Sequence, residues 1–141
     1  MNWEQLLPPQ EREHFSLVPP PAIHDYLAET APAAAQSGSS AVNPALEGVA
    51  VQLIGFIVPI ELTPSGSVSG FFLVPYVGAC VHVPPPAPNQ MIYIHIEKPL
   101  PLLPLYEAYT VSGLMHAQPR GSGLGAAAYT MDLQQIERYG N

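Results

Sequence analysis

The sequence predicts a mainly β protein, a small barrel or sandwich of five or six short strands behind a proline-rich N-terminal extension. Apolar and polar residues alternate along several short segments, which is the period of a strand. Clusters of glycine and proline separate these segments, as turns require. The chain also holds 18 prolines in 141 residues. Proline lacks an N–H donor and fixes φ, so long helices are excluded from much of the sequence.

The expected strands follow one another after residue 48. They cover residues 49–62, 70–75, 80–83, 91–97, 107–116 and 126–136. Gly55 interrupts the first of them and indicates a bulge or a sharp bend, a device that curves a barrel. A five-stranded, partly open barrel of the OB type is one architecture that fits this size and spacing.

Composition divides the chain into two regions. Residues 1–47 are expected to form an N-terminal extension, with helical turns near 11–17 and 23–29 and a linker of Ala, Ser, Gly and Pro over 31–43. Residues 48–141 are expected to form the barrel. Hydrophobic residues make up 48% and charged residues 11% of the whole chain, a balance that favours a folded core over disorder.

The charge balance excludes two classes of partner. The net charge is −7, with four Lys and Arg residues in total. Nucleic-acid binding depends on Lys and Arg at phosphates, and a polybasic membrane patch needs them as well, so we expect neither. No run approaches the ~18 apolar residues of a membrane span. No export signal precedes Trp3, which is what a mature exported chain with an added Met would show.

Cys80 and His82 form the most informative pair in the sequence. They stand two residues apart in a run that reads as extended, and residues i and i+2 of a strand share one face. Thiolate and imidazole together suit Zn²⁺ or a copper ion. His95 and His116 are the first candidates for further ligands, with Glu61, His14 and His24 behind them.

Other interpretations of these residues stay open. Cysteine is often a buried small hydrophobe, and both His95 and His116 can be ordinary surface histidines. Cys80 can also be a nucleophile, although the acidic chain offers little positive charge to lower its pKa. An enzyme is therefore the weaker expectation.

The proline-rich loop beside this pair has two interpretations. Consecutive prolines form a stiff rod that a partner can recognise, or they form a rigid connector that holds the Cys-His run. In the second interpretation, which we favour, Asn89 and Gln90 hydrogen-bond loop backbone. The loop residues concerned are Pro84, Pro85, Pro86, Asn89 and Gln90.

The run from Phe72 to Gln90, with Cys-Val-His-Val-Pro-Pro-Pro at its centre, closely resembles the signature of bacterial domain-of-unknown-function family 3299. The opening at 2–9, the segment at 55–61 and the stretch from 111 to 137 are similar to the same family. The resemblance implies an exported protein of Gram-negative bacteria with an OB-like barrel. It also implies a link to metal-uptake transporters, and its motif falls on Cys80, His82, Asn89 and Gln90.

Residues and resemblance together predict a non-enzymatic periplasmic protein that binds a transition metal, with zinc expected first, through Cys80 and His82. It would assist metal handling beside a metal-transport or envelope protein. The alternative is a protein-interaction module of an envelope or transporter complex, in which Cys80 and His82 are structural and the proline-rich loop meets the partner.

Overall fold

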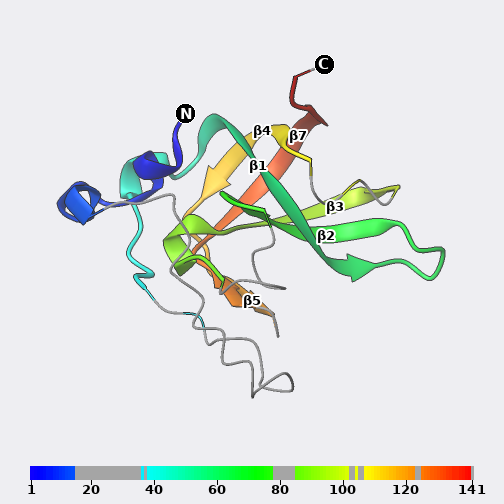
Figure 1. Ribbon diagram of the computed structural model, residues 1–141, viewed down its shortest axis with the longest axis horizontal. Helices are drawn as coiled ribbons and strands as arrows, with labels where there is room; N and C mark the ends of the chain where they lie inside the picture. Colours follow the sequence, from blue (N-terminus) through cyan, green and yellow to red (C-terminus); the bar gives the residue numbers. More distant parts are fainter. Residues whose placement is uncertain are drawn as a thin grey trace.

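The computed structural model describes residues 1–14, 36, 38–77, 85–101, 104, 107–122 and 125–140. One long strand, β1 (Val49–Leu62), forms a curved wall of the fold (Figure 1). Its first half runs antiparallel to β4 (Tyr109–His116) and its second half antiparallel to β2 (Val68–Val74). The change of neighbour falls at Gly55, where a Cβ atom would lie 2.7 Å from the carbonyl oxygen of Val74. Glycine is therefore required where β1 bends.

The other two barrel strands close the sheet. β3 (Ile92–Leu100) runs antiparallel to β2, and β7 (Tyr129–Arg138) lies between β3 and β4. β7 is parallel to β3 and antiparallel to β4, which gives the closed order β1-β2-β3-β7-β4. The predicted OB-like, mainly β fold is confirmed, and the barrel is closed completely.

A small hairpin interrupts the path from β4 to β7. It consists of β5 (Arg120–Ser122) and β6 (Gly125–Ala127), which pair with each other outside the barrel sheet. The segment expected as one strand over 126–136 is thus divided at Ala128. The strand expected over 80–83 lies outside the described residues.

The barrel interior holds the main core. Ile92 and Ile94 point inward and are fully buried, as the alternation in the sequence predicts. A second apolar cluster covers the outer face of β2 and β3, where Phe72 and Tyr93 pack edge to face with their rings 6.2 Å apart. Ala127 of the hairpin belongs to this second cluster.

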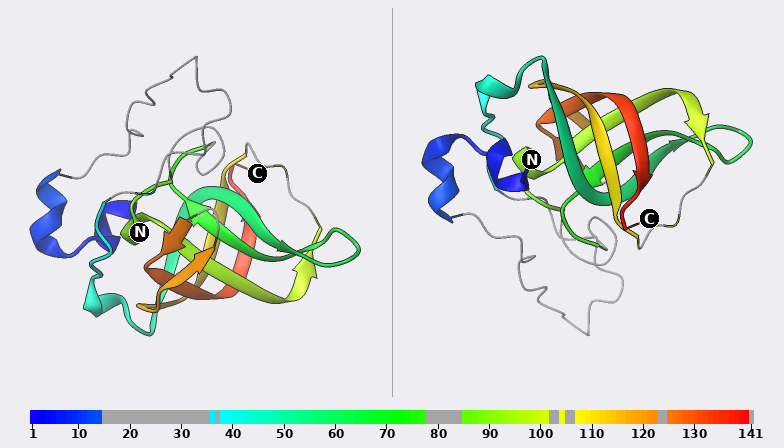
Figure 2. Two further views of the ribbon diagram at one scale, coloured as in Figure 1. Left: turned by 90° about the horizontal axis from the view of Figure 1, so that it is seen from below. Right: turned by 90° about the horizontal axis from the view of Figure 1, so that it is seen from above.

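The start of the chain belongs to the main core as well. Trp3 and Leu6 of the 3-10 helix η1 (Trp3–Leu6) are buried in it. The Trp3 indole donates a hydrogen bond to the carbonyl of Ile54 at 2.8 Å. Two further 3-10 helices follow, η2 (Pro9–His14) and η3 (Pro44–Leu46). All views place these helices at the end of the barrel opposite the β1–β2 turn (Figures 1 and 2).

Helical turns were expected in two places before residue 30. The first overlaps η2, and residues 15–35, which include His24 and the second expected helix, lie outside the described part. None of the helices in the described ranges has the length and apolar character needed to cross a membrane.

Candidate functional site

Cys80, His82 and Pro84 lie outside the described residues, and so does the whole run from 78 to 84. The residues on either side of this run belong to the described part of the chain. β2 ends before it at the fully buried Val74, and the buried Pro85 and Pro86 follow it. Val77, which directly precedes the run, is 44% exposed, whereas Pro85, which directly follows it, is buried.

The side chain of Gln36 holds the chain that follows this run. Its amide donates hydrogen bonds to the carbonyls of Pro86 at 2.9 Å and of Ala126 at 2.8 Å. Its oxygen accepts from the backbone N–H of Ala126 at 2.7 Å. One side chain thus ties the proline-rich connection to the β5–β6 hairpin.

Asn89 and Gln90 bond the same connection to two segments that precede the barrel. Both belong to the 3-10 helix η4 (Pro88–Gln90) and are buried. The Asn89 amide donates to the carbonyl of Ala41 at 3.0 Å, and the Gln90 amide donates to that of Trp3 at 2.9 Å. Both buried amides thus bond backbone carbonyls of other segments, as we expect of a connector. Because Pro85 and Pro86 are buried, these two rings are not available to a partner.

The two candidate histidines lie apart from each other in the sheet and have different partners. His95 projects from the outer face of β3, with 59% of its side chain exposed and Nδ1 3.9 Å from Oε1 of Glu61. This is the outward position that the alternation of β3 predicts. His116 ends β4 and contacts two carboxylates: its Nδ1 lies 3.0 Å from Glu47, and its Nε2 lies 2.8 Å from Asp132.

The contacts of His116 raise its pKa. The hydrogen bond to Asp132 is the largest cause and the bond to Glu47 adds to it, while partial burial acts in the opposite direction. Within the described ranges, no three His, Cys, Asp or Glu side chains are grouped to hold a metal ion. The structure therefore brings each histidine to carboxylates, and it brings His95 and His116 into no common site.

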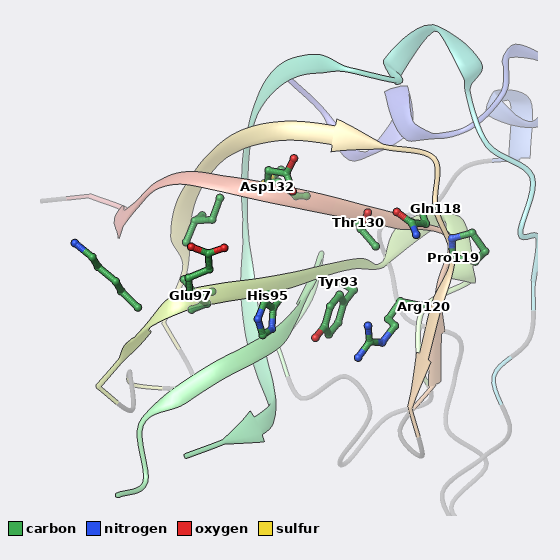
Figure 3. A pocket seen from close by; sticks show the side chains of 12 residues that line it. Tyr93, His95, Glu97, Gln118, Pro119, Arg120, Thr130 and Asp132 are labelled. Atoms are coloured by element: carbon green, nitrogen blue, oxygen red, sulfur yellow. The ribbon is translucent and has the colours of Figure 1, made fainter. Parts of the chain in front are cut away.

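A groove of about 650 Å³ runs over the outer face of β3 and β7, and we call it the β3–β7 groove (Figure 3). Its volume lies within the range of small-ligand sites. Three elements line it: β3, β7 and the residues that lead into β5. The polar side chains that face it include Tyr93, His95, Glu97, Arg120, Thr130 and Asp132.

Glu61, Tyr93 and Arg120 form a polar cluster at one end of this groove. The Tyr93 hydroxyl donates a hydrogen bond to Glu61, and the Arg120 guanidinium stacks over the Tyr93 ring at 4.5 Å from its centre. Burial and then the bond to Glu61 raise the pKa of Tyr93 to about 12, so the phenol keeps its proton. The cluster is therefore a neutral donor bound to a carboxylate beside an arginine.

Only part of this cluster could be predicted from the sequence. Alternation along β3 places Tyr93 and His95 on one outward face, and Glu61 was a candidate because of its carboxylate. Arg120 follows a turn-like stretch with no periodicity, so nothing in the sequence relates it to Tyr93.

The barrel and its anchored connection define a class of small OB-type proteins, and comparisons with known proteins place the chain within it. A model of the family described as "Protein of unknown function (DUF3299)" matches residues 3–138. The chain belongs to the DUF3299 family. It is similar to a DUF3299 family protein of Pseudomonas aeruginosa PAO1 with a known crystal structure, at 37% identity and a TM-score of 0.80. The match covers 100% of this chain and 95% of that one. No curated protein matches.

Proposed function

We propose that the protein is a non-enzymatic periplasmic protein that binds a transition metal ion, Zn²⁺ first, through Cys80 and His82. The two side chains share a face if the run is extended, and thiolate with imidazole is a donor pair that Zn²⁺ and Cu⁺ accept. The family resemblance implies an exported protein with a link to metal-uptake transporters, and this implication supports the location and the role in metal handling. A metal-transport or envelope protein is the partner that we expect.

The observation that supports this function best is the anchoring of the chain directly after the donor run. Pro85 and Pro86 are buried there, and Gln36 and Gln90 hold this connection with hydrogen bonds. A fixed connection of this kind helps to hold a neighbouring site in place.

We expect the other histidines, His95 and His116, to contribute less to metal affinity than Cys80 and His82. β2 and β3 pair so that Leu73 faces Ile92 and Gly70 faces His95. His95 therefore lies three residues, about 10 Å, along β3 from the end of the sheet where the Cys-His connection enters. His116 is engaged by Glu47 and Asp132. We therefore expect Cys80 and His82 to dominate the affinity.

Titration with Zn²⁺, and separately with Cu⁺ under reducing conditions, tests this function. Competition with a chromophoric chelator gives the affinity of the wild type and of a Cys80→Ser, His82→Ala double variant. Loss of first ligands is expected to weaken binding at least tenfold, since even outer-shell changes cost 10- to 100-fold. His95→Gln shows whether the first further candidate ligand contributes, because it removes the exposed imidazole of β3.

Two results decide the proposal. If the double variant binds the metal with the same affinity as the wild type, this metal site is excluded. A large loss in His95→Gln, with none in the double variant, moves the metal to the outer face of β3. Thermal unfolding with and without a chelator supplies a second readout, because a metal bound only by the folded state raises the melting temperature.

A further inference from the structure

The β3–β7 groove concentrates positive charge in a chain that has little of it. Two of the four Lys and Arg residues, Lys98 and Arg120, line this groove. Glu97 and Asp132 line it too, so both signs of charge are present. Figure 3 shows Arg120 at one end beside Tyr93 and Glu97 toward the other end of β3. A groove charged in this way favours a ligand that also carries both signs.

Arg120 is held in place while much of its side chain stays accessible. Its guanidinium group lies over the Tyr93 ring, in a cation–π contact. The nearest oxygen of Glu61 lies 3.8 Å away, longer than a hydrogen bond, and 54% of the Arg120 side chain is exposed. A guanidinium has five N–H donors in a planar fork that fits a carboxylate bidentately. Arg120 is thus oriented and retains donors for an anionic group.

The acidic residues of the groove lie farther along β3 and β7 than the Tyr93–Arg120 contact. Glu97 is exposed and stands four residues after Tyr93 on β3, which corresponds to about 13 Å at ~3.3 Å per residue. Asp132 faces His95 in the parallel pair of β3 and β7, so it lies between the two ends. Asp132 is contacted by His116, so Glu97 is the carboxylate of the groove at which we expect a ligand's ammonium group.

We propose that the β3–β7 groove binds a short peptide with free termini, its carboxylate on Arg120 and its ammonium group at Glu97. An extended peptide spans ~3.3–3.6 Å per residue, so three or four residues match the spacing of about 13 Å. The groove volume of about 650 Å³ accommodates a ligand of this size. The net charge of −7 and the carboxylates in the groove disfavour polyanions. This site is separate from the proposed metal ligands.

Titration of the ¹⁵N-labelled protein with tetraalanine tests the proposal. Amide shifts are expected at Tyr93, Arg120 and Asp132, with saturation in the millimolar range or below. Tetraalanine with an acetylated N-terminus and an amidated C-terminus should bind at least tenfold more weakly, because both charges are removed. Inorganic phosphate and maltose are run in parallel as probes for a simple anion site and a sugar site.

Two variants locate the carboxylate end. Arg120→Gln should weaken tetraalanine binding at least tenfold. Arg138→Gln should leave it unchanged, since Arg138 is a similarly exposed arginine paired with Glu107 outside the groove. Glu97→Gln, which leaves the Tyr93 cluster intact, should weaken binding of the free peptide and spare a peptide that is acetylated at its N-terminus.

Several results overturn the proposal. They are the absence of groove shifts at 10 mM tetraalanine, equal binding of the capped peptide, and equal binding by Arg120→Gln and Arg138→Gln. Saturable binding of phosphate or maltose without binding of tetraalanine also overturns it. If Arg120→Gln does not fold, the outcome is decided by Glu97→Gln, titrated once with the free peptide and once with the peptide acetylated at its N-terminus.

Discussion

The Tyr93 hydroxyl of β3 donates a hydrogen bond to the Glu61 carboxylate of β1, although β2 lies between these two strands. The bond passes over Gly70 of β2, which faces Glu61 on one side and His95 on the other. A Cβ atom at Gly70 would collide with the Glu61 carboxylate. A glycine in the middle strand therefore lets a side chain of one neighbour reach the other.

Tyr93→Phe tests the strength of this bridge. The ring is 4% exposed and packs in the outer cluster, so the change removes the hydroxyl and keeps the packing. We expect a loss of about 1–2 kcal/mol in the free energy of unfolding, since Glu61 loses its donor. Urea unfolding measures it. Tyr139→Phe, at a tyrosine that is 58% exposed, should change little. Equal effects of the two would show that the bridge adds no stability.

Gly70→Ala tests whether the hydrogen bond between Tyr93 and Glu61 needs a glycine at this position of β2. The methyl group would displace the Glu61 carboxylate, and we expect a cost of about 1–3 kcal/mol, as for other overpacked sites. Gly121→Ala is the matched control at another strand glycine. A Cβ atom there would lie 3.7 Å from the Cβ atom of Ala126, which is an ordinary contact distance. Glu61→Ala combined with Gly70→Ala should cost less than the sum of the two changes. An additive result would contradict the steric explanation.

His116→Gln is expected to change the pH dependence of stability. Glu47 and Asp132 raise the pKa of His116 above its usual value in the folded state, so the charged ring is the stabilised form. This stabilisation is complete below about pH 6.5, the usual pKa, and declines as pH rises through the raised pKa. The difference between wild type and variant should therefore be largest in mild acid and should vanish in alkali.

The size of this effect is limited by exposure. The side chains of His116, Glu47 and Asp132 are 31%, 57% and 73% exposed, and such surface pairs contribute about 0.2–1 kcal/mol each at most. Melting temperatures over about pH 5–9 measure it. His95→Gln, at a second histidine on the outer face of the sheet, is the control variant. A difference that grows toward alkaline pH would contradict the assignment.

Trp3→Ala tests the packing of the N-terminal residues into the barrel. The indole is 7% exposed and bonds the carbonyl of Ile54. Its removal should cost about 3–5 kcal/mol. Chemical unfolding followed by circular dichroism measures the loss, and Glu4→Ala at an exposed neighbour is the control. In the wild type, fluorescence of this single tryptophan should report the same transition. Separate transitions would mean that the N-terminal residues detach first.

Local pattern in the sequence predicted much of the barrel. The β-branched alternation in 91–97 fixed which side of β3 is buried, and the bend at Gly55 followed from a glycine within a strand. The parallel pairing of β3 with β7 depends on contacts between segments about 37 residues apart, as in the pair of Ile92 with Tyr129. Periodicity within one segment carries no information about such pairing.

Less of the candidate site could be predicted from the sequence. Cys80 and His82 stand out by residue type alone, whereas the cluster of Glu61, Tyr93 and Arg120 depends on the register of β1, β2 and β3 and on the course of the chain before β5. These are tertiary relationships, and no residue spacing reports them.

The insertion of β7 between β3 and β4 has a consequence for folding. β3 and β4 each have only one barrel neighbour until β7 pairs with them, so two sheet edges stay open until the last barrel strand is in place. Exposed edges of this kind invite pairing with other chains. Chains in which β7 is missing or detached should therefore be the ones that aggregate.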